Sequence, residues 1–234
     1  MNAKEILMKA VVCDRSGRII QALTHYQDGI KILMDLVNEE TDAGRKKVYH
    51  SRIKEYLDRA EQIKERISRF GHSGSLLHNI SIEDGATGYS YYTLFGKYLS
   101  NEVQEVLIEE PYLIERYQFQ NLINFLEVII KNCADLKFVR LVTKTDNKNP
   151  ENQMITLDNI KADLSLREIT LHFTFEDTLH DRKILLSSGY VIKIGRGLHI
   201  YKPNNPRYTL GMCDYDFRKC LQTDVDILRI KKVS

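Results

Sequence analysis

The sequence predicts a two-domain protein in which an all-α bundle of three helices is followed by an α/β domain. In the first 70 residues apolar side chains recur every three or four positions, as in amphipathic helices. From about residue 79 onward, strand-like runs alternate with helical ones, which is typical of α/β domains. The segment Gly71-His72-Ser73-Gly74-Ser75 has the composition of a flexible tether. We therefore expect domains at 1–71 and 79–234, joined by a linker at 72–78.

Helices are expected at 3–14, 18–39 and 45–70, separated by the turn sequences Ser16-Gly17 and Thr41-Asp42-Ala43-Gly44. Because these connections are short, consecutive helices should pack as antiparallel neighbours. In the second domain the clearest strand is 169–175, where apolar and polar residues alternate. Further strands are expected at 103–108, 136–142, 184–186, 190–194, 198–201 and 225–230, with helices at 115–133 and 151–164.

The composition excludes several classes of protein. No run of 18 apolar residues could form a membrane-spanning helix, and the N-terminus lacks the apolar core and cleavage site of a signal peptide. The four cysteines, Cys13, Cys133, Cys213 and Cys220, are widely spaced and form no CxxC pair. Neither a zinc site nor a disulfide framework is therefore expected, and no metal or cofactor is predicted. A reducing, cytoplasmic location fits this pattern.

Charge is distributed unevenly along a chain with 34 basic and 32 acidic residues. Residues 1–71 carry a net charge of +3 and residues 72–234 one of −1, and no nucleic-acid-binding motif is present, so a nucleic-acid partner is not expected. The segment 178–207 nevertheless contains six basic residues and one acid. A locally basic face can meet anionic phosphate groups. The residues predicted to form it are Arg182, Lys183, Lys193, Arg196 and Lys202.

An alternative for these cations is internal pairing. Arg182 and Arg196 are equally compatible with structural ion pairs to Asp214 or Asp216. In that case part of the basic segment would hold the fold together and only the remainder would face a ligand.

The helix at 45–70 is apolar along more than one line of spacing. One line can fill the core of the bundle, and a second would leave a groove for an amphipathic helix beside the helix at 18–39. The simpler alternative is that all of these side chains are core. One line consists of Ile53, Leu57, Ala60 and Lys64, and the other of Tyr56, Ile63, Ile67 and Phe70.

The same helix resembles a known family. The run Tyr56-Leu57-Asp58-Arg59-Ala60-Glu61-Gln62-Ile63-Lys64 closely matches the third helix of MIT (microtubule-interacting and trafficking) domains, and residues 21–30 are similar to their second helix. The resemblance covers residues 3–70. It implies that a groove between the second and third helices binds C-terminal tail helices of ESCRT-III subunits. In it, Leu57 would be a pocket wall and Glu61 an ion-pair acceptor, with Ile53, Ala60 and Lys64 lining the same face.

The sequence His180-Asp181-Arg182-Lys183 lies between two predicted strands and resembles the HxKxxxxD motif of phospholipase D enzymes, in which histidine attacks phosphorus. The match is incomplete. Arg182 occupies the lysine position and Ser187 the position of the aspartate that orients the histidine in that family. Phospholipase D enzymes assemble two copies of the motif, and the only other HxR sequence found, at residues 50–52, lies in the helical bundle.

Two interpretations of this motif remain open at the level of sequence. A single degenerate copy of the motif favours a phospholipase D-like fold that binds a ligand without catalysis. His180 would then be an ordinary polar residue at a strand end. The alternative is a phosphodiesterase whose active site forms across a homodimer, with His180 as nucleophile and Arg182 neutralising the phosphate.

Further segments extend the resemblance over nearly the whole chain, to proteins that join an MIT domain to a phospholipase D-like C-terminal domain. It implies a non-enzymatic adaptor that is recruited by ESCRT-III to the midbody and acts in abscission at the end of cytokinesis. It also implies a C-terminal domain that forms a homodimer and binds acidic phospholipid membranes, so that the protein is cytoplasmic and peripheral to midbody and late endosomal membranes. The segments are residues 85–91, 109–112, 180–182, 192–198 and 210–220.

Overall fold

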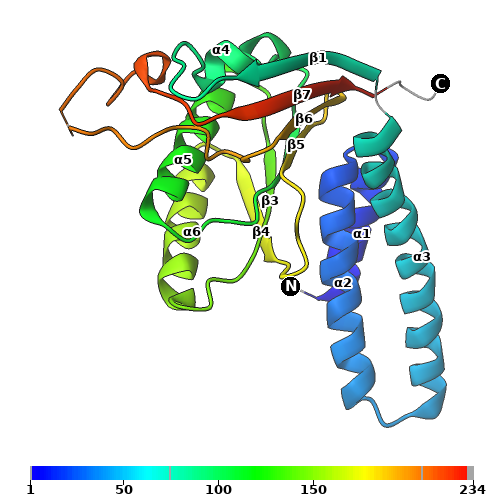
Figure 1. Cartoon of the computed structure of the whole chain (residues 1–234). Coiled ribbons are helices and arrows are strands. Elements are labelled where there is room, and N and C mark those ends of the chain that lie inside the picture. The colour runs from blue at the N-terminus through cyan, green and yellow to red at the C-terminus, as the bar shows by residue number, and fades with distance from the viewer. Residues whose placement is uncertain (1, 74, 207, 231–234) are drawn as a thin grey trace. The chain divides into compact units, whose positions relative to one another are not determined.

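The computed structural model describes residues 2–73, 75–206 and 208–230 (Figure 1). The chain divides into two compact units, Met1–Ser73 and Gly74–Ser234, which we call the helical unit and the sheet unit. The first contains three helices and the second a mixed sheet with helices, which confirms the predicted fold class. No helix among the described residues is both long and apolar enough to span a membrane.

The helical unit is a bundle of α1 (Ala3–Arg15), α2 (Ile19–Glu39) and α3 (Ala43–Ser73). Along α3 the buried residues recur at heptad-like spacing: Ile53, Ala60, Ile63 and Ile67 are all at most 7% exposed. On α2, Gly29 permits a close approach of α1, since a Cβ atom there would lie 2.6 Å from the side chain of Leu7. Helix α3 therefore buries one apolar stripe, whereas α2, which packs against both other helices, is buried over a broader face.

The boundary between the units differs from the expected linker at 72–78. Helix α3 continues through Ser73, and strand β1 (Ser75–Ile82) begins two residues later. The first residues of β1 are held by antiparallel pairing with β7 (Thr223–Arg229), from Ser75 opposite Arg229 onward. Because that partner lies about 150 positions further along the chain, the composition of residues 72–78 alone could not indicate the pairing.

The sheet unit is built on seven strands in the order β1-β7-β6-β5-β2-β3-β4. The pairs β2–β3 and β3–β4 are parallel, and the remaining pairs are antiparallel. The other strands are β2 (Glu105–Glu109), β3 (Phe138–Thr143), β4 (Thr170–Phe175), β5 (Lys183–Leu186) and β6 (Tyr190–Ile194). The two parallel crossovers pass through α5 (Arg116–Asn132) and α6 (Pro150–Ser165).

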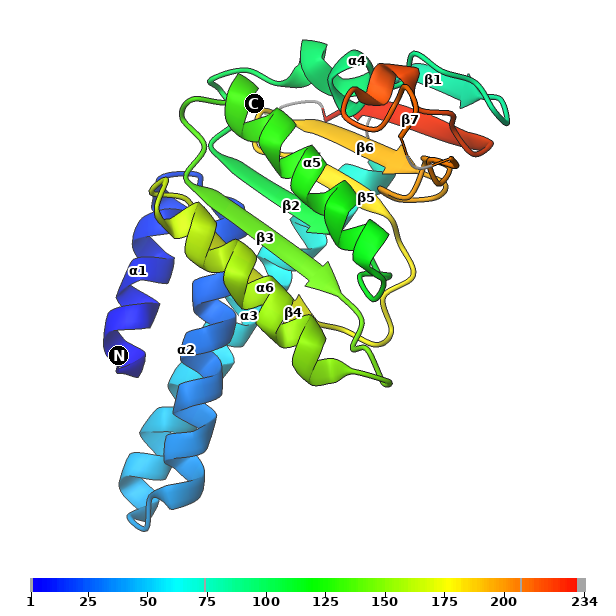
Figure 2. The same ribbon diagram turned by 90° about the vertical axis from the view of Figure 1, so that its left-hand side faces the viewer.

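Helices α5 and α6 cover one face of this sheet (Figure 2). The core lies between them and alternate strand residues such as Ile108, Leu141, Ile184 and Ile192, each at most 2% exposed. The small helix α4 (Tyr91–Phe95) adds Tyr91 and Phe95 to the same core. Two short 3-10 helices, Gly96–Tyr98 and Tyr215–Phe217, complete the unit.

The expected strand at 198–201 is wrong. Residues 195–198 form a turn, and Tyr201 makes only an isolated bridge with Cys220. The apolar side chains that suggested a strand, Leu198 and Ile200, are buried in the core from a loop, at 3% and 0% exposure. Burial rather than strand pairing therefore explains their apolar character.

Candidate functional site

On the helical unit, α3 presents an exposed strip formed by Leu57, Glu61 and Lys64. Leu57 is 36% exposed, which is high for a leucine in a packed bundle. The other two predicted groove residues, Ile53 and Ala60, are each only 6% exposed and belong to the core stripe. The structure thus brings together three of the five predicted residues on the surface, with the other two beneath them.

The opposite flank of α3 is tied to α1. Arg59 donates from Nε and Nη2 to the two carboxylate oxygens of Asp14, at 2.7 and 2.8 Å, and Tyr26 on α2 donates to Asp14 at 3.3 Å. At 100° per residue, Arg59 lies 140–200° around the helix from Leu57, Glu61 and Lys64. The exposed strip therefore lies on the flank of α3 turned away from Asp14.

In the sheet unit, the five predicted cations fall into two groups. Lys183 and Lys193 are cross-strand neighbours on β5 and β6. They alternate with the core residues Ile184 and Ile192 and therefore lie on the sheet face opposite α5 and α6. Lys183 bonds Glu109 at 2.9 Å and Asp181 at 3.1 Å, and Lys193 stands opposite Asp226 in the register. These two lysines thus belong to a mixed-charge surface.

Of the other three cations, Arg182 and Arg196 lie where β2 and β6 end and β5 begins, and Lys202 contacts Asp84 after the end of β1, at the same edge of the sheet. We call Arg182, Arg196 and Lys202 the cationic edge. Arg182 donates to the carbonyl of Gly195 at 2.6 Å and stacks over the ring of Tyr112 at 4.9 Å, and Arg196 donates to the carbonyl of Gln222 at 2.9 Å. The alternative pairing with Asp214 or Asp216 does not describe these contacts, because both arginines bond backbone carbonyls. Each guanidinium is held in place by a neutral acceptor, so these contacts do not neutralise its positive charge.

Lys202 completes the cationic edge through Asp84, whose carboxylate it contacts at 2.5 Å. The hydrogen bond from Lys202 lowers the pKa of Asp84, and the positive charge of Arg196 acts in the same direction. Asp84 therefore connects Lys202 electrostatically to Arg196. Because the Asp84 side chain is 60% exposed, this contact is a weak surface pair that an anionic ligand can displace.

A buried carboxylate, which the sequence analysis did not single out, holds the turn that carries Arg196. Glu110 accepts the N–H of Leu198 at 2.7 Å, while the hydroxyl of Tyr91 donates to the carbonyl of the same residue. Burial raises the pKa of Glu110 to about 7, although hydrogen bonds from Leu198 and Tyr112 lower it. The neighbouring Gly197 has φ +61°, and a Cβ atom there would lie 2.0 Å from a Glu110 oxygen. Glycine is therefore required at this position.

His199, which follows this turn, was also missed by the sequence analysis because it lies outside any HxK motif. Its ring contacts that of Tyr117 at 4.6 Å between centroids. Burial, together with the positive charges of Arg196 and Arg182, lowers the pKa of His199, so the imidazole is neutral at pH 7. His180 is exposed and precedes β5.

Ser187 occupies the position of the missing aspartate but lies at the other end of β5 from His180. Its hydroxyl accepts the N–H groups of Gln104 and Glu105, at 2.9 and 3.1 Å, and thereby caps the start of β2. Ser187 therefore has a structural role. Within the described residues, no group of three or more histidine, cysteine, aspartate or glutamate side chains is arranged to hold a metal ion.

The fold and the sites define an MIT-type helical bundle joined to a phospholipase D-like sheet domain. The profile of the MIT (microtubule interacting and transport) domain matches residues 1–65, and that of the phospholipase D-like domain at the C-terminus of MIT matches residues 88–229. The chain therefore belongs to the family of MIT proteins with a C-terminal phospholipase D-like domain. It is 36% identical over 230 residues to MIT domain-containing protein 1 of Mus musculus, covering 98% of this chain and 92% of the mouse protein.

Proposed function

We propose that this protein is a non-enzymatic adaptor that binds ESCRT-III C-terminal tails through its MIT unit and acidic phospholipid membranes through its phospholipase D-like unit. Its place of action would be the cytoplasmic face of midbody and late endosomal membranes, where it acts in abscission. A homodimer formed by the sheet unit would double the membrane contacts. Membership of the MIT family and the two exposed sites support this assignment.

The observation that supports tail binding is the exposed strip on α3. Leu57 offers an apolar contact, and Glu61 and Lys64 flank it with opposite charges. An amphipathic tail helix with leucines and basic residues is complementary to such a strip. In a titration with a tail peptide, Leu57→Asp should abolish binding and Val48→Asp should not, since Val48 is an exposed residue, at 59%, elsewhere on the same helix. Unchanged affinity in folded Leu57→Asp protein would contradict the assignment.

The observation that supports membrane binding is the cationic edge, in which Arg196 is exposed and donates its hydrogen bond to a backbone carbonyl. Each cation near an anionic leaflet contributes about 1 kcal/mol, reduced by salt. The adjacent loop adds apolar side chains that can enter the interface: Tyr208, Leu210 and Phe217 are 81%, 81% and 55% exposed. Large apolar side chains exposed together in one loop are uncommon unless they contact a partner or membrane.

The test is co-sedimentation of the full chain with vesicles of phosphatidylserine and phosphatidylcholine, at low and physiological salt. Arg196→Glu should weaken binding at both salt concentrations, and Leu210→Ser should weaken the binding that survives at physiological salt. Arg167→Glu serves as the matched control, since Arg167 follows α6 and its side chain bonds Asp163 of that helix. Equal binding by Arg196→Glu and Arg167→Glu would argue against the cationic edge as the membrane site.

A phosphodiesterase is the second candidate, and one observation favours it. The charges of both Arg182 and Arg196 act on His199, so a second histidine lies near the motif that begins at His180. Measuring headgroup release in the same tubes as sedimentation separates the two functions. Binding without release is expected for the adaptor. Release that disappears in His180→Ala would make this protein an enzyme.

A further inference from the structure

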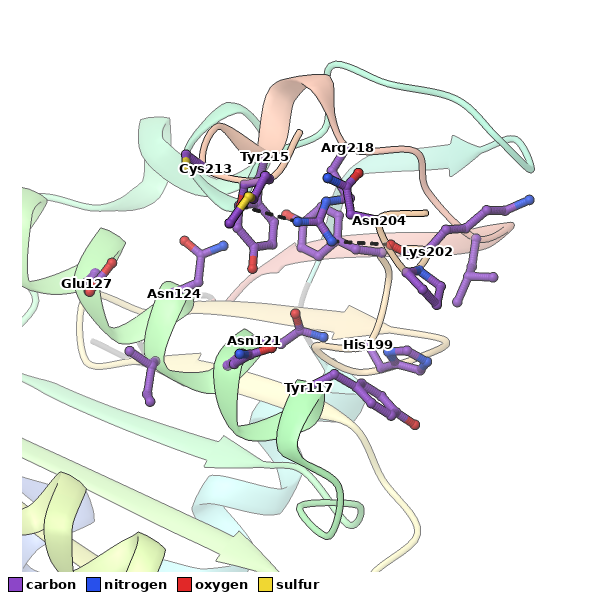
Figure 3. Close-up of a pocket in the computed structure, with 16 residues that line it drawn as sticks. Tyr117, Asn121, Asn124, Glu127, His199, Lys202, Asn204, Cys213, Tyr215 and Arg218 are labelled. Atoms are coloured by element: carbon purple, nitrogen blue, oxygen red, sulfur yellow. Dashed lines mark hydrogen bonds between the residues drawn. The ribbon is translucent and has the colours of Figure 1, made fainter. Parts of the chain in front are cut away.

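A pocket of about 730 Å³ lies beside the cationic edge, between α5 and the loop at 199–221 (Figure 3). Tyr117, Asn121, Asn124 and Glu127 project into it from successive turns of α5, and Tyr215 and Asn204 lie on the loop side. His199 stands at one end, near Tyr117, and Glu127 at the other. We call this pocket the α5 groove. Its volume is within the range of ligand-binding sites. The groove shares Lys202 with the cationic edge, but the functions proposed above do not use its α5 wall.

Primary amides dominate the α5 wall of the groove. Gln120, Asn121 and Asn124 all line it, and Asn121 is only 6% exposed. Each amide offers one acceptor and one NH₂ donor, which are complementary to the N–H and C=O of a peptide backbone. The Nδ2 atom of Asn124 and the Nδ1 atom of His199 are buried and find no hydrogen-bond partner among the described residues. Unsatisfied buried polar groups are uncommon in native structures, and a ligand in the groove could bond these two after a small rotation of each side chain.

The loop wall is fixed by Arg218. Its guanidinium donates to the carbonyls of Gly211, Lys202 and Met212 and stacks over the ring of Tyr215 at 5.0 Å. The Arg218 guanidinium is thus held against the loop wall by neutral acceptors. The amide and aromatic lining of the groove is suited to an uncharged peptide backbone.

The two ends of the groove differ in charge. Lys202, which is paired with the exposed Asp84, lines the end near His199, where Arg196 also acts on the imidazole, whereas Glu127 lines the other end. Between Tyr117 and Glu127, α5 rises by about 15 Å, at 1.5 Å per residue. An extended chain advances about 3.3 Å per residue, so this length corresponds to roughly five residues.

We propose that the α5 groove binds an extended peptide segment of a partner protein, about five residues long, with an acidic side chain near Lys202 and a basic side chain near Glu127. The amides of Asn121 and Asn124 bond its backbone, and the rings of Tyr117 and Tyr215 pack against its side chains. This site is distinct from the strip on α3, which suits a helix, and from the cationic edge, which suits a phosphate-bearing surface.

The experiment uses the full chain in lipid-free buffer and a displayed library of random heptapeptides. Selection should enrich sequences that place an acidic and a basic residue four to six positions apart. The most enriched peptide, synthesised with a fluorophore, is then titrated by fluorescence anisotropy. Asn124→Leu should weaken its binding about tenfold, the effect of losing roughly 1.4 kcal/mol of hydrogen bonding. Asn159→Leu, the same change at an exposed position of α6, should leave it unchanged.

Glu127→Lys provides a second test that does not depend on a buried position, since Glu127 is exposed and its replacement should fold normally. Selection on this variant should exchange the preferred basic residue for an acidic one. Three results would overturn the proposal: no enrichment relative to Asn124→Leu, equal affinity for Asn124→Leu and the wild type, or peptides whose binding depends on Arg196 and not on Asn124. The last result would indicate a purely electrostatic surface.

Discussion

A single buried carboxylate, Glu110, controls the geometry of the cationic edge. It holds the N–H of Leu198 while Tyr91 holds the carbonyl, so both backbone groups of that residue are fixed from the core. The flanking residues Arg196 and His199 are positioned as a result. Burying the charged Glu110 carboxylate costs free energy, because burial favours the neutral form of a carboxyl group.

The raised pKa of Glu110 predicts that the free energy of unfolding depends on pH. Because the pKa of Glu110 is about 7 in the fold and 4.5 ordinarily, the folded state holds an extra proton between these values. The stabilisation from that proton is fully present below pH 4.5 and is lost as pH rises through 7. Relative to Glu110→Gln, the wild type should therefore lose about 2.5 kcal/mol of unfolding free energy between pH 5 and pH 8. Urea denaturation of both proteins at each pH measures this, and parallel profiles would show that Glu110 does not titrate as described.

The ion pair of Asp14 and Arg59 makes a second residue-level prediction. The hydrogen bond from Arg59 lowers the pKa of Asp14, so the pair stabilises the bundle above pH 3.8 and this contribution disappears as pH falls through the lowered value. The Arg59 side chain is 46% exposed, so we expect a coupling of only about 1 kcal/mol. A double-mutant cycle with Asp14→Asn and Arg59→Gln at pH 7 measures it. Zero coupling in low salt would show that the bidentate contact is not maintained in solution.

At the scale of elements, the loop at 202–218 contains the short 3-10 helix Tyr215–Phe217 and is otherwise held by the hydrogen bonds of Arg218. Lysine keeps the charge at this position but cannot reach three carbonyls with a planar fork. Losing about 2 kcal/mol of local hydrogen bonding should speed hydrogen exchange in Arg218→Lys roughly thirtyfold. The effect should be visible at the N–H of Met212, which bonds Thr209, and absent at β6. A uniform increase over both segments would indicate global destabilisation instead.

The elements that the sequence predicted are those whose pattern is local. The stripes of α2 and α3 and the alternation in β4 are visible within a few residues. Strand β1 was missed because its partner β7 is distant and its residues are mostly exposed. Within the sites, Leu57 and Arg182 could be predicted from motifs. Glu110 and His199 could not, because their roles arise only when the end of β2 meets the turn after β6.

For the whole molecule, avidity would set how tightly the protein binds a surface that offers both ligands. The strip on α3 and the cationic edge each offer few contacts, and a surface cation is weakened by salt. When one chain carries both, binding at the first site makes binding at the second intramolecular. The proposed adaptor function therefore does not require either site to bind tightly by itself.

This predicts a specific behaviour on vesicles that contain phosphatidylserine and also display a coupled ESCRT-III tail peptide. The wild-type chain should bind them about 10²–10⁴ times more tightly than vesicles with either feature alone. Leu57→Asp and Arg196→Glu should each reduce binding to the single-feature level, although they change different units. Raising salt should weaken the wild type and Leu57→Asp by the same electrostatic factor and should affect Arg196→Glu less. If the affinity for doubly featured vesicles equals that of the better single feature, the two sites do not act together, and the protein is not an adaptor in this sense.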